Sequence, residues 1–431
     1  MSDVVIVGAS LAGLRAAEEL RIRGFAGRIT LLGDEPDTPY DRPPLSKQVL
    51  GGAWSVDRTA LTVAGADGLD GLGLDLRLGV RATGLDLAAR TLTVEGAAGD
   101  GDGGDPGGEA LAFDGLVIAT GCAARRLPGT DGIAGVHVLR TLADCTALRA
   151  ALGQGARRVV VVGGGFIGAE VAATCRGLGL EVTLVEALPV PLGRVLRDEI
   201  GAVLADLHRE HGVDVRLGVG VDGLDTAPHG PSSPGGHADA GEHVRAVRLA
   251  DGTTIDADLV VVGIGVVPAT GWLEGSGVRL DNGVVCDETT LAAPGVVAAG
   301  DVARWPSARA GGIVRVEHWD NAIAMGQHAA GRLLAELGEP GGAVEAYDPV
   351  PWFWSDQYDR KIQLAGHPVG ADELRVVDGS TEERRFVALY RRGDALAAVL
   401  AMNRPRPVVT YRGLLERGAT WSEALDAAGV S

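Results

Sequence analysis

The chain has 431 residues, a formal net charge of -18 and four cysteines. This length is too great for one ordinary domain and predicts two to four domains. The acidic balance argues against nucleic acid as a partner. The cysteines, Cys122, Cys145, Cys175 and Cys286, form no CxxC or CxxxxC pattern. This spacing excludes a disulfide scaffold, a zinc ribbon, a protein-borne iron–sulfur cluster and a redox-active dithiol, and we expect no metal site.

The start of the chain carries no targeting pattern. A strand is predicted from Val4 with no basic segment before it, and the longest apolar run, residues 259–268, is too short to cross a bilayer. We therefore expect a soluble, cytoplasmic protein that does not bind membranes.

Residues 4–35 read as strand, glycine turn, helix and strand. The turn runs from Gly8 to Gly13 and is followed by a predicted helix to about Gly24 and a strand at residues 29–32. This order is typical of a dinucleotide site, in which phosphates bind at the start of the helix. Ser10 stands where the middle glycine of the motif is expected, which weakens the match.

Residues 158–186 repeat this unit with all of its parts. A β-branched strand at residues 159–162 leads into Gly163, Gly165 and Gly168, and a helix is predicted to start near Ile167. The glycines allow a tight turn, close approach of a pyrophosphate, and packing of the helix on the strand. A second strand at 182–185 ends in Glu186, whose carboxylate suits the ribose hydroxyls of NADH and repels the extra phosphate of NADPH.

The two halves agree beyond the glycines. Residues 113–121 close the first half as residues 255–265 close the second, and hairpin-like sequence precedes each closing strand. We interpret this as an internal duplication with one half nested inside the other. Two low-complexity stretches, 95–110 and 225–243, are expected to be solvated loop extensions of the hairpins. A buried strand is predicted before Asp301, then a helix from 320 to about 338, and then a separate domain of strands and one or two helices.

Seven segments, in this order, resemble the FAD-dependent, NADH-linked ferredoxin reductases. They are residues 8–13, the YDRPPLSK segment at 40–47, 119–121, the central GGGFIGAE at 163–170, 299–301, 317–322 and the WFWSDQ segment at 352–357. The resemblance covers essentially the whole chain. It implies an α/β fold with two nested Rossmann-like domains and a C-terminal α+β domain, as in glutathione reductase. The implied bounds are 1–122 and 270–334 for an FAD-binding domain, 123–269 for an NAD-binding domain, and 335–431 for the C-terminal domain.

The resemblance also implies which residues bind FAD. It assigns the pyrophosphate to the Gly8 turn, the adenosine ribose to Asp34 or, as second choice, Glu35, the phosphates to Arg125, the ribityl chain to Asp301 and the pyrimidine edge to Trp319. The full set is Gly8, Ala12, Gly13, Asp34, Glu35, Arg42, Lys47, Ala82, Thr120, Gly121, Arg125, Asp301 and Trp319. Ala124 stands where a proline commonly precedes this arginine.

For NADH, the resemblance implies a site built around Glu170, which would meet the nicotinamide. The implied set is Gly163, Gly165, Ile167, Gly168, Glu170, Glu186 and Gly265. Lys47 and Glu170 are the expected catalytic residues. The chain has only two lysines, Lys47 and Lys361, so arginine supplies almost every other cation. A compact ammonium can donate to flavin N5 or O4 and pair with Glu170, which a planar guanidinium would not do equivalently.

The function implied is hydride transfer from NADH to FAD, followed by single-electron transfer to a [2Fe–2S] ferredoxin that serves a cytochrome P450 or a ring-hydroxylating oxygenase. An acidic ferredoxin would need a basic patch, for which Arg384, Arg385, Arg391, Arg392, Arg404 and Arg406 are candidates. For Trp354, a place beside the flavin and a place in the core or at a domain interface are both open. We expect a hydrogen-bonded structural role for His318, because hydride transfer needs no general acid.

Other functions stay open on the same fold. A peroxidase or a coenzyme A-disulfide reductase would need a cysteine before Cys122, and the chain has none there. A reductase of a quinone or of monodehydroascorbate would fit the same motifs. A redox-responsive binding protein similar to apoptosis-inducing factor ranks last, since the sequence offers no broad basic surface.

Overall fold

The computed structural model describes residues 2–65, 67–96, 108–228 and 241–430. The chain forms two compact units. The first comprises the residues up to Asp41, Thr59–Ala123 and Val267–Phe353, and the second comprises Arg42–Arg58, Ala124–Val266 and the residues from Trp354 onward. The chain passes between the units within β8 (Cys122–Ala124), β17 (Val266–Pro268) and β23 (Trp352–Gln357).

The first unit is built on a six-stranded sheet. Its order is β19 (Leu291–Ala293), β20 (Val296–Ala298), β7 (Gly115–Ile118), β1 (Asp3–Val7), β2 (Arg28–Gly33) and β3 (Asp75–Leu78). All neighbours pair in parallel except β19 with β20. Apolar side chains cover both faces of β1, β7 and β20, which is why these strands read as unbroken hydrophobic runs.

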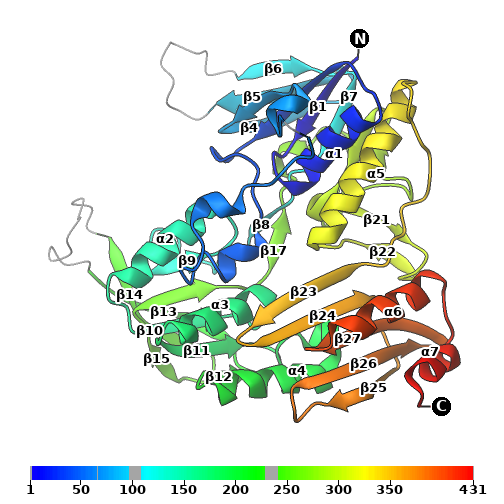
Figure 1. The fold of residues 1–431 in the computed structure, drawn as a ribbon. Helices are drawn as coiled ribbons and strands as arrows, with labels where there is room; N and C mark the ends of the chain where they lie inside the picture. Colours follow the sequence, from blue (N-terminus) through cyan, green and yellow to red (C-terminus); the bar gives the residue numbers. More distant parts are fainter. Residues whose placement is uncertain (1, 66, 97–107, 229–240, 431) are drawn as a thin grey trace. The chain divides into compact units, whose positions relative to one another are not determined.

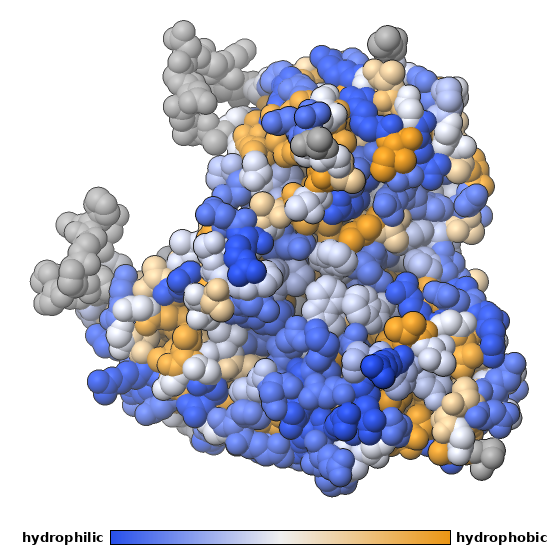
Figure 2. All heavy atoms as spheres, viewed as in Figure 1, coloured by the Kyte–Doolittle hydropathy of each residue, from blue (hydrophilic) through white to orange (hydrophobic). Residues whose placement is uncertain are grey.

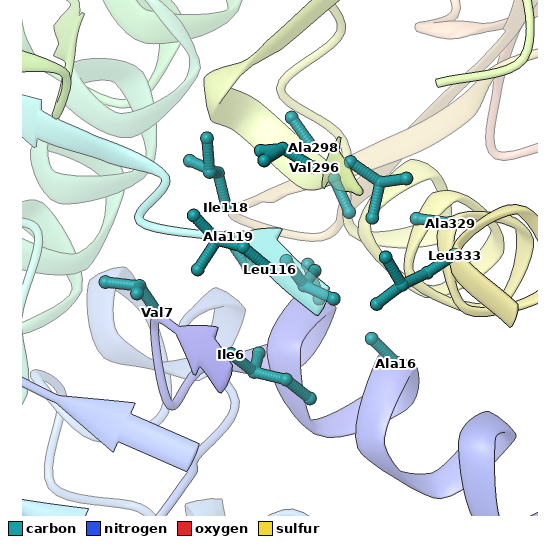
Figure 3. Packing of buried hydrophobic residues seen from close by; sticks show 14 of the residues in the cluster. Ile6, Val7, Ala16, Leu116, Ile118, Ala119, Val296, Ala298, Ala329 and Leu333 are labelled. Carbon is teal, nitrogen blue, oxygen red and sulfur yellow. The ribbon is translucent and has the colours of Figure 1, made fainter. Parts of the chain in front are cut away.

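Two helices pack together on this sheet. α1 (Leu11–Ile22) and α5 (Trp319–Leu337) lie side by side, in blue and yellow in Figure 1. A Cβ atom added to Gly326 would lie 2.4 Å from the carbonyl oxygen of Ala12, so only glycine allows this approach. Figure 3 shows Ala16 and Leu333 of these helices beside Leu116 and Val296 of the sheet.

Smaller elements complete the first unit. Three antiparallel strands follow β3, and a second small sheet precedes α5. The elements are β4 (Val80–Asp86), β5 (Thr91–Gly96), β6 (Glu109–Ala112), β18 (Val284–Val285), β21 (Ala303–Ser307), β22 (Gly312–Val314) and the short helices η3 (Asp70–Leu72), η4 (Gly271–Leu273) and η5 (Gly300–Val302).

The second unit contains a five-stranded parallel sheet. Its order is β12 (Asp214–Leu217), β11 (Glu181–Glu186), β10 (Arg158–Val162), β16 (Leu259–Val262) and β9 (Val136–Val138). Its other elements are η1 (Pro43–Ser46), η2 (Val56–Thr59), α2 (Leu142–Gly153), α3 (Phe166–Gly177), α4 (Gly193–Glu210) and the antiparallel strands β13 (Val221–Pro228), β14 (Glu242–Leu249) and β15 (Thr254–Asp256). Arg197, with φ of 68°, interrupts α4.

The C-terminal part of the second unit is a five-stranded antiparallel sheet with two helices. The strand order is β23, β24 (Arg360–Gly366), β27 (Ala395–Met402), β26 (Arg385–Arg392) and β25 (Glu373–Ser380), and the helices are α6 (Pro405–Glu416) and α7 (Trp421–Ala428). Thr420 caps α7 through a reciprocal pair of hydrogen bonds with Glu423. Figure 2 shows hydrophilic and hydrophobic side chains mixed over this part of the second unit.

The expected α/β fold with a duplicated nucleotide-binding unit is confirmed. The strands β20, β7, β1, β2 and β3 have the same spatial order as β9, β16, β10, β11 and β12, and a three-stranded antiparallel sheet accompanies each set. The expected loop extensions at 95–110 and 225–243 lie largely outside the described residues. Their ends are not loop but strand, because β5, β6, β13 and β14 extend into both stretches. No helix in the described part of the chain is long and apolar enough to cross a membrane.

Candidate functional site

The glycine turn between β10 and α3 is closed by backbone contacts. Gly163 has φ of 104°, and a Cβ atom there would lie 2.4 Å from the carbonyl oxygen of Gly263. A Cβ atom on Gly168 would lie 2.0 Å from the carbonyl oxygen of Gly163. At Gly165, the N-cap of α3, the nearest atom to an added Cβ is 3.8 Å away, so this position opens onto space. The turn therefore fits the close approach of a pyrophosphate to the first turn of α3.

Glu186 lies beside this turn. Its Oε2 accepts a hydrogen bond of 2.7 Å from the backbone N–H of Gly164, and its Oε1 accepts one of 2.8 Å from Leu188. Pairing of β10 with β11 in register places Val185 opposite Val162 and brings the next residue, Glu186, to the end of the sheet where the turn begins. A carboxylate at this place fits the ribose of a dinucleotide whose phosphates lie on α3.

Glu170, one turn into α3, is the centre of a buried polar cluster. Its Oε2 accepts from the Ser46 hydroxyl at 2.5 Å and from Lys47 Nζ at 2.8 Å, and its Oε1 accepts from the Ser355 hydroxyl at 2.8 Å. Glu170 is only 3% exposed. The structure thus brings together the two expected catalytic residues, Lys47 and Glu170, and adds two serines that the sequence analysis missed.

The segment that carries Lys47 is fixed on the second unit by several hydrogen bonds. The Thr174 hydroxyl donates to the carbonyl oxygen of Ser46 at 2.7 Å, and the Cys145 thiol donates to that of Leu45 at 3.3 Å. Arg42 Nη1 donates to the carbonyl oxygen of Arg140 at 2.7 Å. Lys47 is therefore held against α3 rather than placed on a mobile surface loop.

The glycine turn of the first unit repeats the same backbone geometry. Gly8 has φ of 119°, and a Cβ atom there would lie 2.1 Å from the carbonyl oxygen of Ala119. A Cβ atom on Gly13 would lie 2.0 Å from the carbonyl oxygen of Gly8. Ser10 is the N-cap of α1, and its side chain makes no capping hydrogen bond. This turn also fits a pyrophosphate, with a serine at the place where the second unit has Gly165.

The acidic residues after β2 differ from Glu186 in position. Leu32 pairs with Val7 as Val185 pairs with Val162, so Gly33 is the counterpart of Glu186 and Asp34 lies one residue later. The side chain of Asp34 is 60% exposed and lies 3.7 Å from Arg81. Glu35 Oε2 accepts a hydrogen bond of 2.6 Å from the Tyr40 hydroxyl.

Other expected FAD residues lie at several places in the first unit. Gly300 has φ of 75°, and a Cβ atom added there would lie 2.9 Å from that of Ala12, which brings η5 and its Asp301 to the first turn of α1. The Thr120 hydroxyl donates to the carbonyl oxygen of Ala269 at 2.8 Å, and Gly121 has φ of 64°. Ala82, in β4, is buried.

Two further expected residues have clear partners. Trp319 begins α5, and its Nε1 donates to Asp41 Oδ1 at 2.8 Å. Arg125 belongs to the second unit, where its backbone N–H donates to the carbonyl oxygen of Gly265 at 3.0 Å. Gly265 has φ of 96° and open space at its Cβ position. Ile167, in the first turn of α3, is 45% exposed.

Three of the four cysteines are poor nucleophiles. All four are buried and unlinked. Burial raises the pKa of Cys145 to about 11 and those of Cys175 and Cys286 to about 12. Since the thiolate is the reactive form, these three thiols stay protonated at neutral pH.

Comparisons with known proteins agree with this geometry. Residues 2–326 match the family profile described as pyridine nucleotide-disulphide oxidoreductase, and residues 352–429 match the reductase C-terminal profile. The chain is 40% identical to the ferredoxin reductase subunit of a 5,5'-dehydrodivanillate O-demethylase from Sphingobium sp., over 96% of this chain and 93% of that protein. It is 38% identical to rhodocoxin reductase from Rhodococcus erythropolis, over 96% and 89% of the two chains. Among solved structures, putidaredoxin reductase in its covalent complex with putidaredoxin matches with a TM-score of 0.84 and 33% identity, over 96% and 93% of the chains.

Proposed function

Because the chain belongs to the pyridine nucleotide-disulphide oxidoreductase family, we propose that it is an NADH-dependent ferredoxin reductase. The motifs had indicated this family, and the matches along both parts of the chain confirm it. The observation that carries the proposal is the buried pair of Lys47 and Glu170, one helical turn beyond a glycine turn shaped for a dinucleotide.

FAD and NADH are the cofactors of this family, and both glycine turns suit them. FAD, when bound, takes two electrons together from NADH and passes them on one at a time. This property suits a [2Fe–2S] ferredoxin, which accepts single electrons. The relatives named above are reductases of that kind, so we take the partner to be a ferredoxin of a cytochrome P450 or oxygenase system.

In the second unit, the chain's own residues would hold NADH. The N–H groups at the start of α3 would bind the pyrophosphate, and Glu186 would accept the ribose hydroxyls. Glu170 would contact the carboxamide of the nicotinamide, since a carboxylate has about four acceptor positions and three are used by Ser46, Lys47 and Ser355. Lys47 would present its ammonium to the flavin from a fixed position.

The remaining assignments are proposals of the same kind. In the first unit, Gly8, Ala12 and Gly13 would bind the FAD pyrophosphate, and Asp301 the ribityl chain. We favour Asp34 over Glu35 for the ribose, because Glu35 is engaged by Tyr40 whereas Asp34 is largely exposed. The domain bounds 1–122 with 270–334, 123–269 and 335–431, and a location in the cytoplasm, also remain proposals.

The arginines of the C-terminal sheet and helices give only limited support for a basic ferredoxin-docking surface. Three of them are paired with carboxylates of the same unit: Arg384 with Glu210 at 2.6 Å, Arg391 with Glu373 at 2.9 Å, and Arg404 with Asp378 at 3.4 Å. Their charges are thus largely neutralised. Arg385 and Arg406 remain exposed candidates.

The decisive experiment is NADH-dependent reduction of cytochrome c by the FAD-loaded protein, with and without an added [2Fe–2S] ferredoxin, repeated with NADPH. We expect a large rate that needs ferredoxin and NADH. Rapid flavin reduction without any ferredoxin effect would indicate a small acceptor such as a quinone. Sluggish flavin reduction would indicate a redox-responsive binding protein instead.

A further inference from the structure

The carboxylate of Glu170 is held from two sides by different parts of the chain. Ser46 and Lys47, which lie in and just after η1, bind one oxygen, and Ser355 in β23 binds the other. Removing either set would leave the carboxylate able to rotate about its last side-chain bond. Two-sided contact therefore fixes both the carboxylate plane and the position of the Lys47 ammonium.

The Ser355 hydroxyl has only one hydrogen to donate, and its surroundings direct it. Gln357 Nε2 lies 3.3 Å from the hydroxyl oxygen as a donor, so the serine hydrogen is left for Glu170. Ser355 and Gln357 are both fully buried. They share one face of β23 because side chains two residues apart point to the same side of a strand.

The end of β23 is in turn fixed on α4. Tyr358 has φ of 56° at the turn into β24. Its hydroxyl lies 2.9 Å from His208 Nδ1, and its ring stacks on that of His211 with centroids 3.6 Å apart. These contacts hold the strand that carries Ser355 in one place relative to the second unit's parallel sheet.

We propose that Ser355 is a positioning residue for the Lys47–Glu170 pair, so that the C-terminal sheet completes the site where the nicotinamide binds. This inference rests on the proposed function, in which Glu170 meets the nicotinamide. Without the Ser355 hydroxyl, Glu170 Oε1 loses its donor and the carboxylate turns toward Lys47 and Ser46. Lys47 then loses its single fixed position, and NADH meets a misaligned carboxylate.

The two lysines of the chain allow a direct test. In the FAD-loaded protein labelled with 15N at lysine Nζ, two side-chain ammonium signals are expected, from Lys47 and from Lys361, whose Nζ lies 2.8 Å from Asp356. Ser355→Ala should shift and broaden the Lys47 signal and leave that of Lys361 unchanged. The same variant should slow flavin reduction by NADH about tenfold, because small misplacements in a site are costly to the rate.

Two further variants make the test specific. Ser355→Thr keeps a hydroxyl and should restore the Lys47 signal and most of the rate. Ser307→Ala is the matched control, because the buried Ser307 hydroxyl donates to Asp348 at 2.5 Å within the first unit. It should leave both lysine signals and the reduction rate unchanged.

The outcomes separate this proposal from the proposed function. An unchanged Lys47 signal in Ser355→Ala, with the rate within about twofold of the original, would overturn the positioning role. An equal change of the Lys47 signal in Ser307→Ala would also overturn the positioning role. If the Lys47 signal responds as expected but ferredoxin is not reduced, the positioning role stands and the proposed electron acceptor is wrong.

Discussion

Lys47 Nζ lies 2.8 Å from Glu170 Oε2, and the two side chains are only 12% and 4% exposed. The residues are far apart in sequence and meet because η1 packs against α3. Two buried charges stabilise each other only while both are present, since either one alone is left uncompensated in a poorly solvated place. The pair is therefore expected to be sensitive to loss of either partner.

We expect Lys47→Met and Glu170→Gln each to lower the free energy of unfolding by about 3 kcal/mol, and the double variant to lose less than the sum. Urea unfolding of the four proteins measures this coupling. Both single variants should also reduce flavin with NADH at least about tenfold more slowly. Lys361→Met is the control, because its pair with Asp356 is half exposed and should be worth less than about 1 kcal/mol. Rates within a few-fold of the original in both variants would contradict the active-site assignment.

Substitutions at three glycines in and just before α3 should distinguish effects on folding from effects on NADH binding. Gly168→Ala should destabilise the protein strongly, because its Cβ would lie 2.0 Å from a backbone oxygen. Gly165→Ala should fold normally, since nothing lies within 3.8 Å of the new atom, but should bind NADH at least about tenfold more weakly if the pyrophosphate approaches there. Gly177→Ala, at the open end of α3, is the control and should gain up to about 1 kcal/mol. Thermal unfolding of each variant measures its stability, and NADH titration measures its affinity. Unchanged NADH binding in Gly165→Ala would place the pyrophosphate elsewhere.

The parts of the site that follow from local pattern were predictable. The glycine turns, α1, α3 and the acid at the end of β11 are encoded by short-range sequence: β-branched runs, glycines that need positive φ, and a fixed length of helix. Lys47 and Glu170 were identified from the resemblance of their segments. Their pairing was expected once the resemblance had assigned both to the flavin site, but local pattern alone could not predict it, because the hydrogen bond joins residues 123 positions apart.

The serines show where sequence reasoning failed. Ser355 meets Glu170 across 185 positions, and a serine in a strand is ordinarily a neutral choice. The one available signal was the alternation in β23, where residues 353, 355 and 357 are buried and two of them are polar. A buried polar residue needs a partner, so that pattern predicts a hydrogen-bonding network, though not which residue completes it.

Glu186 should decide between NADH and NADPH. Glu186→Gln keeps an acceptor for the Gly164 N–H but removes the negative charge that would repel a 2'-phosphate. We expect the ratio of kcat/KM for NADH over NADPH to fall by about tenfold or more, mainly through a lower KM for NADPH. Glu181→Gln, at the exposed opposite end of β11, is the control and should leave the ratio unchanged. A constant ratio in Glu186→Gln would show that coenzyme choice is made by other residues.

His208 should make the stability of the second unit depend on pH. It is fully buried, and its pKa is lowered from 6.5 to about 4, chiefly by burial and then by the nearby His211, against a smaller opposing effect of the Gln357 side chain. As the pH falls, His208 is therefore protonated at a higher pH in the unfolded chain than in the folded one. The contribution of neutral, buried His208 to the free energy of unfolding is fully present above pH 6.5. It is lost as the pH falls toward 4, by about 3 kcal/mol in total.

A neutral replacement isolates this contribution from other titrating groups. In urea unfolding between pH 7 and pH 4.5, His208→Gln should lose less stability than the original protein as the pH falls. Tyr358→Phe, which removes the hydroxyl beside His208 Nδ1 but keeps the ring on His211, should be less stable at pH 7 by about 1 kcal/mol and keep the original pH dependence. Parallel curves for the original protein and His208→Gln would mean that His208 takes up its proton equally well in the folded chain. In that case, the buried surroundings of His208, including its hydrogen bond with Tyr358, would have to rearrange to accept a charged ring.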